Sequence, residues 1–246
     1  MTLRVAGLRK SFGPLAVTDG VSLSVPAPGL HALIGPNGAG KTSFINQVMG
    51  TLAPDAGSVH LDGRDLTGLP PHRRARVGLA RTFQISQLVP GFTARQNAAL
   101  AVQARNPAPL RWWGRAERDA AANDAAEAAL EAVGLAARAG IRAQELSHGE
   151  RRALELACAL ALAPRCILLD EPLAGLGHEE AGRMIVLLAR VKTSCGLLMV
   201  EHDMDAVFRL ADRVSVLVAG RVVAEGTPAE IRADPAVRAA YLGDAC

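Results

Sequence analysis

The chain has 246 residues, a length that suits one large α/β domain or a domain with an inserted subdomain. Half of the residues are apolar, and the net charge at pH 7 is only +3, with arginines scattered among acidic residues. We therefore expect a globular protein with a mixed surface, and not a nucleic-acid binder, which gathers its basic residues in one stripe. The four cysteines have neither C-x-x-C nor metal-ligand spacing, which favours reduced thiols and a cytosolic setting.

No segment of the sequence has the length and composition of a membrane span. The longest apolar stretch, Leu154 to Leu169, contains Glu155, Pro164 and Arg165, and it is shorter than the about 20 apolar residues that cross a bilayer. The first residues also lack the apolar region of a signal peptide. Any membrane role is therefore expected to come through a partner.

The first part of the chain predicts short strands followed by a helix. Glycines and prolines separate the expected strands, which are Leu3 to Leu8, Val21 to Val25 and His31 to Ile34. A helix is expected from Lys41 to Met49, closed by Gly50, and a further strand at Val59 to Leu61 leads into a turn.

Strand signals disappear over residues 84–144, where an alanine-rich helical pattern, clearest over 115–133, predicts a helical insertion. An α/β alternation then resumes. The expected elements are helices over 149–163 and 179–192, strands over 166–170 and 197–200, a hairpin over 214–224 that turns at Gly220, and short helices after Thr227 and Pro235. Short apolar strands that alternate with helices predict a parallel sheet buried on both faces.

The segment from Gly35 to Thr42 fits the phosphate-binding pattern G-x-x-x-x-G-K-[ST], after an apolar strand and before a helix. Such glycines let successive N–H groups point at phosphates, and the helix N-terminus adds partial positive charge. Lys41 is expected to reach the β- and γ-phosphates of ATP, and Thr42 to bind Mg²⁺. The alternative is a chance glycine-rich turn. The ATP-binding residues predicted here are Gly35, Pro36, Asn37, Gly38, Ala39, Gly40, Lys41, Thr42 and Ser43.

Two carboxylates, Asp170 and Glu171, follow the apolar segment Ile167 to Leu169. Ligands of such sheets bind at the carboxyl ends of the strands. Asp170 is therefore expected to hold Mg²⁺ through water, and Glu171 to take a proton from the attacking water. The alternative is a strand-end turn with solvated acids, since Pro172 follows at once.

The segment Ser147-His148-Gly149-Glu150 fits S-x-x-E, a helix capping box, and one interpretation is that it only begins a helix. Gly149 in the first turn weakens helix propensity but allows close approach to the backbone. A capped helix N-terminus with a bare glycine is also a good anion site.

These motifs occur in one order that, with three further residues, resembles the ATP-binding cassette (ABC) ATPases. The three are Phe12, Gln84 in Arg81-Thr82-Phe83-Gln84, and His202 in Val200-Glu201-His202-Asp203. The resemblance covers essentially the whole chain. It implies an α/β fold with a P-loop NTPase, RecA-like core and an N-terminal antiparallel β subdomain over residues 1–83 and 151–246. It also implies an inserted helical subdomain over 84–150, ending in the signature motif.

The resemblance also implies roles for single residues. Phe12 would stack on adenine, and Gln84 would contact Mg²⁺ and the γ-phosphate and couple to the transport partner. His202 would contact the γ-phosphate and orient the attacking water beside Glu171. The signature residues would contact the ATP bound by a second copy or a paralogue in a head-to-tail dimer; they are Ser147, His148, Gly149 and Glu150.

Two positions depart from the family's pattern. His148 replaces the first glycine of the signature's Gly-Gly, and we expect activity to survive. Gly177 replaces an Asp or Asn that follows the turn after Glu171, which puts one contact across the dimer interface in question.

The segments 78–84, 201–204 and 234–243 resemble the ATPase subunits of branched-chain amino-acid importers. This implies an importer of branched-chain or related small amino acids or amides, on the cytoplasmic face of the inner membrane. Its partners would be membrane permease subunits and, indirectly, a solute-binding protein, with no nucleic acid. One alternative is the ATPase of a lipopolysaccharide-type exporter, which has a similar tail. The other is a soluble ABC ATPase of translation or DNA repair, a class that usually has two cassettes or long coiled coils.

Three further features are given ordinary interpretations. Trp112 and Trp113 are expected to pack in the helical insertion, with a contact to a partner as the alternative. The cluster from Pro71 to Arg76 is expected on a solvated helix face. Four histidines without metal spacing are expected at the edge of the core or in solvent: His31, His60, His72 and His178.

Overall fold

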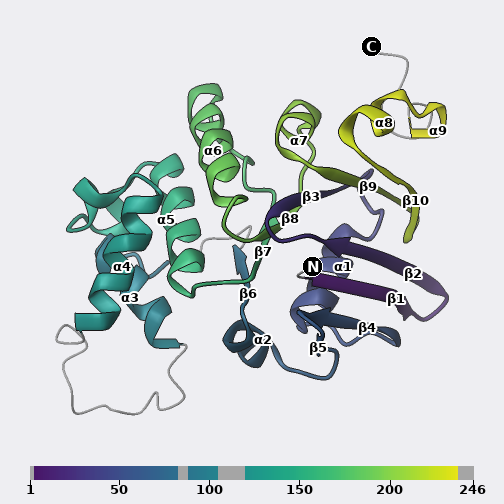
Figure 1. The fold of residues 1–246 in the computed structure, drawn as a ribbon, viewed down its shortest axis with the longest axis horizontal. Helices are drawn as coiled ribbons and strands as arrows, with labels where there is room; N and C mark the ends of the chain where they lie inside the picture. Colours follow the sequence, from purple (N-terminus) through teal and green to yellow (C-terminus); the bar gives the residue numbers. More distant parts are fainter. Residues whose placement is uncertain (1–2, 83–87, 105–119, 238–246) are drawn as a thin grey trace.

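Two β-sheets form the frame of the molecule (Figure 1). The structure is a computed structural model, and it describes residues 3–82, 88–104 and 120–237. The smaller sheet is antiparallel, with the strand order β2-β1-β4-β5. Its strands are β1 (Leu3–Phe12), β2 (Leu15–Val25), β4 (Ala56–Leu61) and β5 (Arg64–Asp65).

The larger sheet has six strands in the order β10-β9-β3-β8-β7-β6. Neighbouring strands from β9 to β6 pair in parallel, and only β10 is antiparallel. The loops that follow the parallel strands therefore leave at one edge of the sheet. The strands are β3 (Gly29–Ile34), β6 (Leu79–Thr82), β7 (Cys166–Asp170), β8 (Gly196–Val200), β9 (Arg213–Val218) and β10 (Arg221–Gly226).

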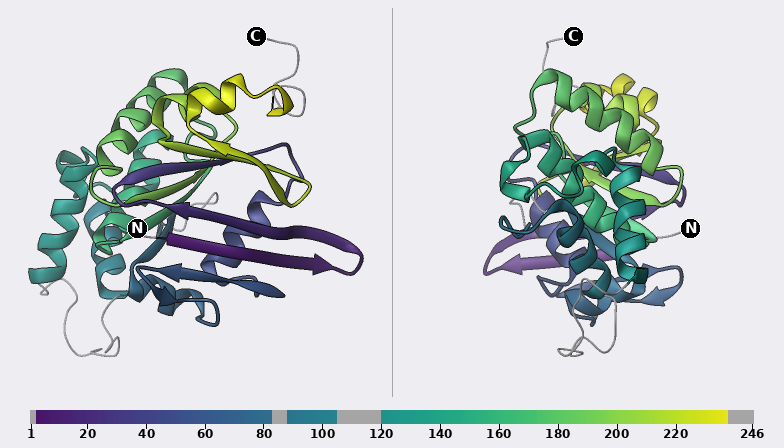
Figure 2. Two further views of the ribbon diagram at one scale, coloured as in Figure 1. Left: turned by 45° about the vertical axis from the view of Figure 1, so that its right-hand side comes forward. Right: turned by 90° about the vertical axis from the view of Figure 1, so that its left-hand side faces the viewer.

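Helices α1, α5, α6 and α7 cover the larger sheet. Figures 1 and 2 place α3 and α4 at the far end of the molecule from the antiparallel sheet, beside α5. The helices are α1 (Lys41–Met49), α2 (Pro71–Val77), α3 (Ala94–Ala104), α4 (Ala120–Ala132), α5 (His148–Ala161), α6 (His178–Val191), α7 (Met204–Leu210), α8 (Pro228–Ala233) and α9 (Pro235–Val237). Two 3₁₀ turns, η2 (Ala136–Arg138) and η3 (Ala143–Glu145), precede α5.

Alternating side chains of the central strands face two separate cores. In β7, Ile167 and Leu169 pack in the core that holds α5 and α6, whereas Leu168 packs with Phe44 of α1 in the core beneath the antiparallel sheet. All four are at most 1% exposed. Because successive strand residues point to opposite faces, a strand covered on both sides must be apolar throughout, as the sequence pattern predicts.

Helices α3, α4 and α5 pack against one another, and α5 also contacts β6 and α6. The boundary predicted between residues 150 and 151 falls inside α5, which runs unbroken from His148 to Ala161. The division into a core and an inserted subdomain stays a prediction. Within the described ranges, no helix is long and apolar enough to cross a membrane. Trp112, Trp113 and the tail beyond 237 lie outside those ranges.

Within residues 3–82, 88–104 and 120–237 the predicted elements are confirmed in type, and α1 and β7 also have the predicted bounds. Three elements were not predicted. The first, β5, has only two residues. Strand β6 reads Leu-Ala-Arg-Thr, and its central arginine breaks the apolar pattern. Helix α7 is a short helix whose start depends on a cap, since the Asp203 side chain accepts a hydrogen bond from the N–H of Ala206.

The prediction for His31 is wrong, because β3 is a central strand and its side chain is fully buried. Its Nδ1 lies 2.9 Å from the Ser24 carbonyl oxygen and its Nε2 lies 2.8 Å from the Ser215 hydroxyl oxygen. Burial lowers the pKa of the His31 imidazole. His31 is therefore a hydrogen-bonded core residue.

The prediction of a solvated helix face over Pro71 to Arg76 is wrong for Arg74. That side chain is 1% exposed, and burial lowers its pKa. The guanidinium donates to four backbone carbonyls, those of Leu69, Gln47, Val48 and Thr67, at 2.6–2.9 Å. Two of these belong to the last turn of α1, where helical carbonyls lack intrahelical partners. Arg74 therefore ties α2 to the end of α1.

Replacing Arg74 with methionine should lower the free energy of unfolding by about 3 kcal/mol, because buried carbonyl groups lose their donors. Urea unfolding would measure the change. The control is Arg73→Met on the exposed side of α2, which should alter stability by no more than about 0.5 kcal/mol. Equal losses for the two variants would contradict the structural role given to Arg74.

Candidate functional site

The predicted phosphate-binding loop, residues 35–42, connects β3 to α1, and two of its glycines are required by close backbone contacts. A Cβ at Gly35 would lie 2.1 Å from the carbonyl oxygen of Leu217, and a Cβ at Gly40 would lie 2.1 Å from that of Val17. Gly40 caps α1 in the left-handed conformation without a side-chain hydrogen bond. The first N–H groups of α1 therefore point out of the helix, where an anion can accept from them.

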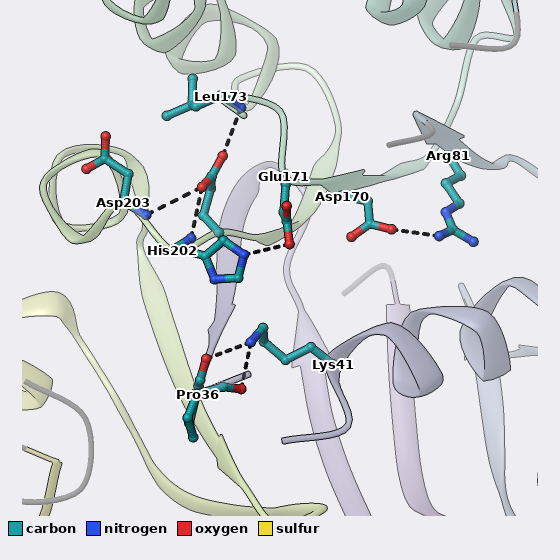
Figure 3. A network of polar contacts seen from close by, with 10 residues as sticks. Pro36, Lys41, Arg81, Asp170, Glu171, Leu173, His202 and Asp203 are labelled. Atoms are coloured by element: carbon teal, nitrogen blue, oxygen red, sulfur yellow. Dashed lines mark hydrogen bonds and ion pairs between the residues drawn. The ribbon is translucent and has the colours of Figure 1, made fainter. Parts of the chain in front are cut away.

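The Lys41 side chain folds back over this loop. Its Nζ donates to the carbonyl oxygens of Gly35, at 2.6 Å, and Pro36, at 3.0 Å, and the residue is only 7% exposed (Figure 3). Burial lowers the pKa of the Lys41 ammonium, while the negative charge of Glu171 opposes the shift. The ammonium is thus placed where a bound phosphate would compete with two carbonyls for its N–H groups.

Asp170 ends β7 as a buried carboxylate, 4% exposed, and it forms an ion pair with a residue of the neighbouring strand. The Arg81 Nη2 lies 2.7 Å from Asp170 Oδ2 (Figure 3). The Nη1 of the same guanidinium donates to Asn46 Oδ1 of α1, at 2.8 Å. One arginine therefore links β7 to the helix that follows the phosphate-binding loop.

Glu171 and His202 form a second pair at the same edge. The Glu171 Oε1 lies 2.6 Å from His202 Nε2. A carboxylate can only accept, so the proton of this hydrogen bond is on Nε2. Glu171 adopts a left-handed conformation with φ 50°, uncommon for residues other than glycine and frequent at functional sites. Figure 3 shows Lys41, Asp170, Glu171 and His202 around one region where the loops after β3, β7 and β8 meet.

The N-terminus of α5 holds the predicted capping box. The Ser147 Oγ accepts from the N–H of Glu150 at 3.2 Å, and Glu150 Oε2 accepts from the N–H of Ser147 at 2.8 Å. A side-chain hydrogen bond from Arg138 is the main cause that lowers the pKa of Glu150. The depression around this end is lined by residues of α5, of α6 and of the segment 133–138, and by none of residues 35–42.

A carboxylate from α6 already sits on the N-terminus of α5. The Glu180 Oε1 accepts from the N–H of Gly149 at 3.1 Å and lies 3.4 Å from Ser147 Oγ. A Cβ at position 149 would lie 2.6 Å from the same oxygen. Glycine therefore lets an anion approach this helix end closely, which supports its interpretation as an anion site.

Of the two other residues predicted to contact ATP, Phe12 and Gln84, the structure describes only Phe12. Phe12 is 53% exposed at the end of β1, with the Lys10 ammonium 5.7 Å from its ring centre. Gln84 lies outside the described residues.

The predicted Mg²⁺ ligands include the oxygens of Thr42, an exposed residue in the first turn of α1, and of Asp170. Hydroxyl and carboxylate oxygens suit this hard cation, which keeps several ligands from water and phosphate.

Sequence reasoning missed three polar residues of this region: Arg81, Glu180 and Glu201. No local signal pointed to Arg81, because the strand that carries it, β6, was not itself predicted. Glu201 is 3% exposed, and its carboxylate accepts hydrogen bonds from the backbone N–H groups of Leu173 and His202.

Comparison with known proteins identifies the family. Residues 18–174 match the family described as ABC transporter, and residues 221–246 match that described as Branched-chain amino acid ATP-binding cassette transporter. The chain is an ABC transporter ATPase. The predicted family and fold class are thereby confirmed.

Relatives of this ABC ATPase align with it over nearly their whole length. The high-affinity branched-chain amino acid transport ATP-binding protein BraF of Pseudomonas aeruginosa is 38% identical, over 99% of this chain and 98% of its own. The lipopolysaccharide export system ATP-binding protein LptB of Acidithiobacillus ferridurans is 35% identical, over 98% and 97%. A solved nucleotide-free ATP-binding cassette from an ABC transporter superposes with a TM-score of 0.86, at 30% identity and 99% coverage of both chains.

Replacing Gly40 with alanine should lower the affinity for ATP about tenfold or more, because the loop must move away from Val17 and lose its anion-binding geometry. Titration with a fluorescent ATP analogue would measure it. Gly63→Ala is the matched control, since Gly63 is also left-handed (φ 81°) but a Cβ there has nothing within 4 Å. An unchanged affinity in Gly40→Ala would rule out the close-contact argument.

Proposed function

We propose that this chain is the ATP-hydrolysing subunit of an importer for branched-chain or related small amino acids or amides. The main support is the convergence of Lys41, Asp170, Glu171 and His202 at one edge of the parallel sheet. The importer assignment is supported by the similarity to BraF and by the match of the C-terminal segment to the branched-chain amino acid family.

In the proposed reaction the phosphates of ATP lie on the loop from Gly35 to Ser43. Backbone N–H groups and the Lys41 ammonium would neutralise phosphate charge, and Phe12 would stack on adenine. Mg²⁺, held by Thr42, Gln84 and Asp170 partly through water, would neutralise charge on the β- and γ-phosphates. Asp170 would hold the ion from its position beside Arg81.

Glu171 would act as the general base of hydrolysis. Its carboxylate would take a proton from the water that attacks the γ-phosphate, and His202, 2.6 Å away, would hold that carboxylate and contact the γ-phosphate. The hydrogen bond from His202 Nε2–H fixes one carboxylate oxygen and orients the other.

The signature residues would complete the site from a second subunit. Ser147 caps α5, and His148, Gly149 and Glu150 form its first turn, where the N–H of Gly149 donates to Glu180. The N–H groups at a helix N-terminus can bind ATP only where they face its phosphates. A head-to-tail dimer, with a copy or a paralogue, would place it there. Membrane permease subunits would hold the dimer at the cytoplasmic face of the membrane, and a solute-binding protein would supply the substrate to them.

Glu171→Gln should bind ATP with an affinity close to that of the wild type and hydrolyse it about a hundredfold more slowly or worse, because the amide keeps the shape but cannot take a proton. Phosphate release and nucleotide titration would measure the two quantities. Glu179→Gln, exposed at the start of α6, is the control and should hydrolyse normally. Wild-type turnover in Glu171→Gln would refute the assignment of the base.

Glu180→Ala should raise the affinity of ATP-dependent dimerisation severalfold, because the partner's γ-phosphate would no longer compete with an internal carboxylate for the N–H of Gly149. Analytical ultracentrifugation with ATP in the Glu171→Gln background would measure it. Glu179→Ala removes a neighbouring first-turn carboxylate that pairs with Arg183 and serves as the control. Equal or weaker dimerisation in Glu180→Ala would argue against the head-to-tail site.

The exporter alternative has one observation in its favour, the 35% identity to LptB. Purification of the tagged chain from its native membranes and identification of the permease subunits would decide between the two. Permeases accompanied by a solute-binding protein that binds leucine or a related amide would support the importer. Recovery with lipopolysaccharide-transport subunits would overturn it.

A further inference from the structure

Glu201 is a buried carboxylate that the proposed reaction does not use. It follows the last residue of β8 and precedes His202, and it is 3% exposed. Burying a charge is unfavourable unless hydrogen bonds replace the lost water. Its hydrogen-bond partners therefore show what it does in the fold.

The carboxylate bridges two loops of the candidate site. Its Oε1 accepts from the N–H of Leu173, at 2.8 Å, in the loop after β7 (Figure 3). Its Oε2 accepts from the N–H of His202, at 2.9 Å, and lies 3.4 Å from the N of Asp203, in the loop after β8. One loop carries Glu171 and the other carries His202, so the bridge joins the two halves of the catalytic pair.

The bridge begins where the sheet stops holding these loops. The ladder between β7 and β8 ends at the pair Asp170 and Val200, and one further bond joins the N–H of Glu171 to the carbonyl of Val200. Beyond that point, a side chain replaces the ladder as the link between the two segments.

A side chain that accepts at both of its oxygens suits these partners. The three hydrogen bonds come from backbone N–H groups, and a carboxylate is an acceptor at both oxygens. An amide of the same size would turn an NH₂ group toward an N–H on one of the two sides. Glutamine should therefore keep the volume and break one half of the bridge.

We propose that Glu201 is a positioning residue that holds the loop after β7 and the loop after β8 together, so that His202 stays within hydrogen-bond reach of Glu171. The inference rests on the proposed roles of Glu171 and His202 in ATP hydrolysis. Glu201 acts through these residues and does not itself contact substrate.

The first experiment needs no activity. Hydrogen exchange of the full-length wild-type chain, followed by NMR, should show slow exchange at the amides of Leu173 and His202, although both lie in loops. Rapid exchange at these amides in the wild type would overturn the bridge outright. In Glu201→Gln the protection should fall at one or both amides.

Asp212→Asn is the matched control, since Asp212 Oδ2 accepts from the N–H of Leu30 at 2.7 Å, at the opposite edge of the parallel sheet. It should change exchange at Leu30 and not at Leu173 or His202. Loss of protection at the two loop amides in both variants would indicate general loosening and would overturn the proposal.

The second experiment is a double-mutant cycle on kcat for ATP, with Glu201→Gln, His202→Ala and the combination. Glu201→Gln should lower kcat about tenfold or more and leave KM for ATP within about twofold, because orientation and not binding is lost. The kcat of the double variant should be no lower than that of His202→Ala, because Glu201 cannot position a side chain that has been removed. Asp212→Asn should keep the wild-type kcat.

The outcomes separate this inference from the proposed function. The role of Glu201 would be overturned by a wild-type kcat in Glu201→Gln, or by a fold-loss of kcat in the double variant equal to the product of the losses in the two single variants. In both cases Glu171→Gln would still be inactive. Full activity in Glu171→Gln would instead overturn the proposed catalytic site, and the exchange experiment would still decide whether the bridge exists.

Discussion

The parallel pairing of β3, β8 and β7 is the constraint on which the candidate site depends. Val200 lies opposite Leu33 on one side and Asp170 on the other, so the three strands end within one residue of one another. A slip of one residue would move a loop by about 3.3 Å and turn its side chains to the other face. Such a slip would break the 2.6 Å contact between Glu171 Oε1 and His202 Nε2. Two apolar cores, one on each face, fix the register.

Buried polar side chains then connect elements that apolar packing alone would leave free. Arg74 binds the end of α1, Arg81 joins Asp170 to Asn46, and Glu201 joins two loops. Each such group is costly to bury and becomes favourable only when its hydrogen bonds are made, so each accepts one arrangement of its neighbours. Apolar packing sets which layers meet, and these groups set how the ends of the layers lie.

The sequence predicts what depends on local patterns. The bounds of α1 and β7, the capping box at Ser147 and the glycine-rich loop follow from spacing and from residue type. The burial of Arg74 does not follow, because its acceptors come from α1 and from the turn before α2. Nor does the pair of Arg81 and Asp170, 89 residues apart in the chain. A partner that is close only in space leaves no mark on a local pattern.

The position of Glu180 gives a physical reason why one chain would hold only half of a site. The N-terminus of α5 attracts an anion, and within one subunit the anion that reaches it is a carboxylate of α6. A γ-phosphate carries more charge and more acceptor oxygens than a carboxylate, so it would compete for the same N–H. Helix α6 follows the loop that Glu201 ties to His202. In the proposed dimer, displacing Glu180 from α5 would therefore act on the segment that positions the proposed pair of Glu171 and His202.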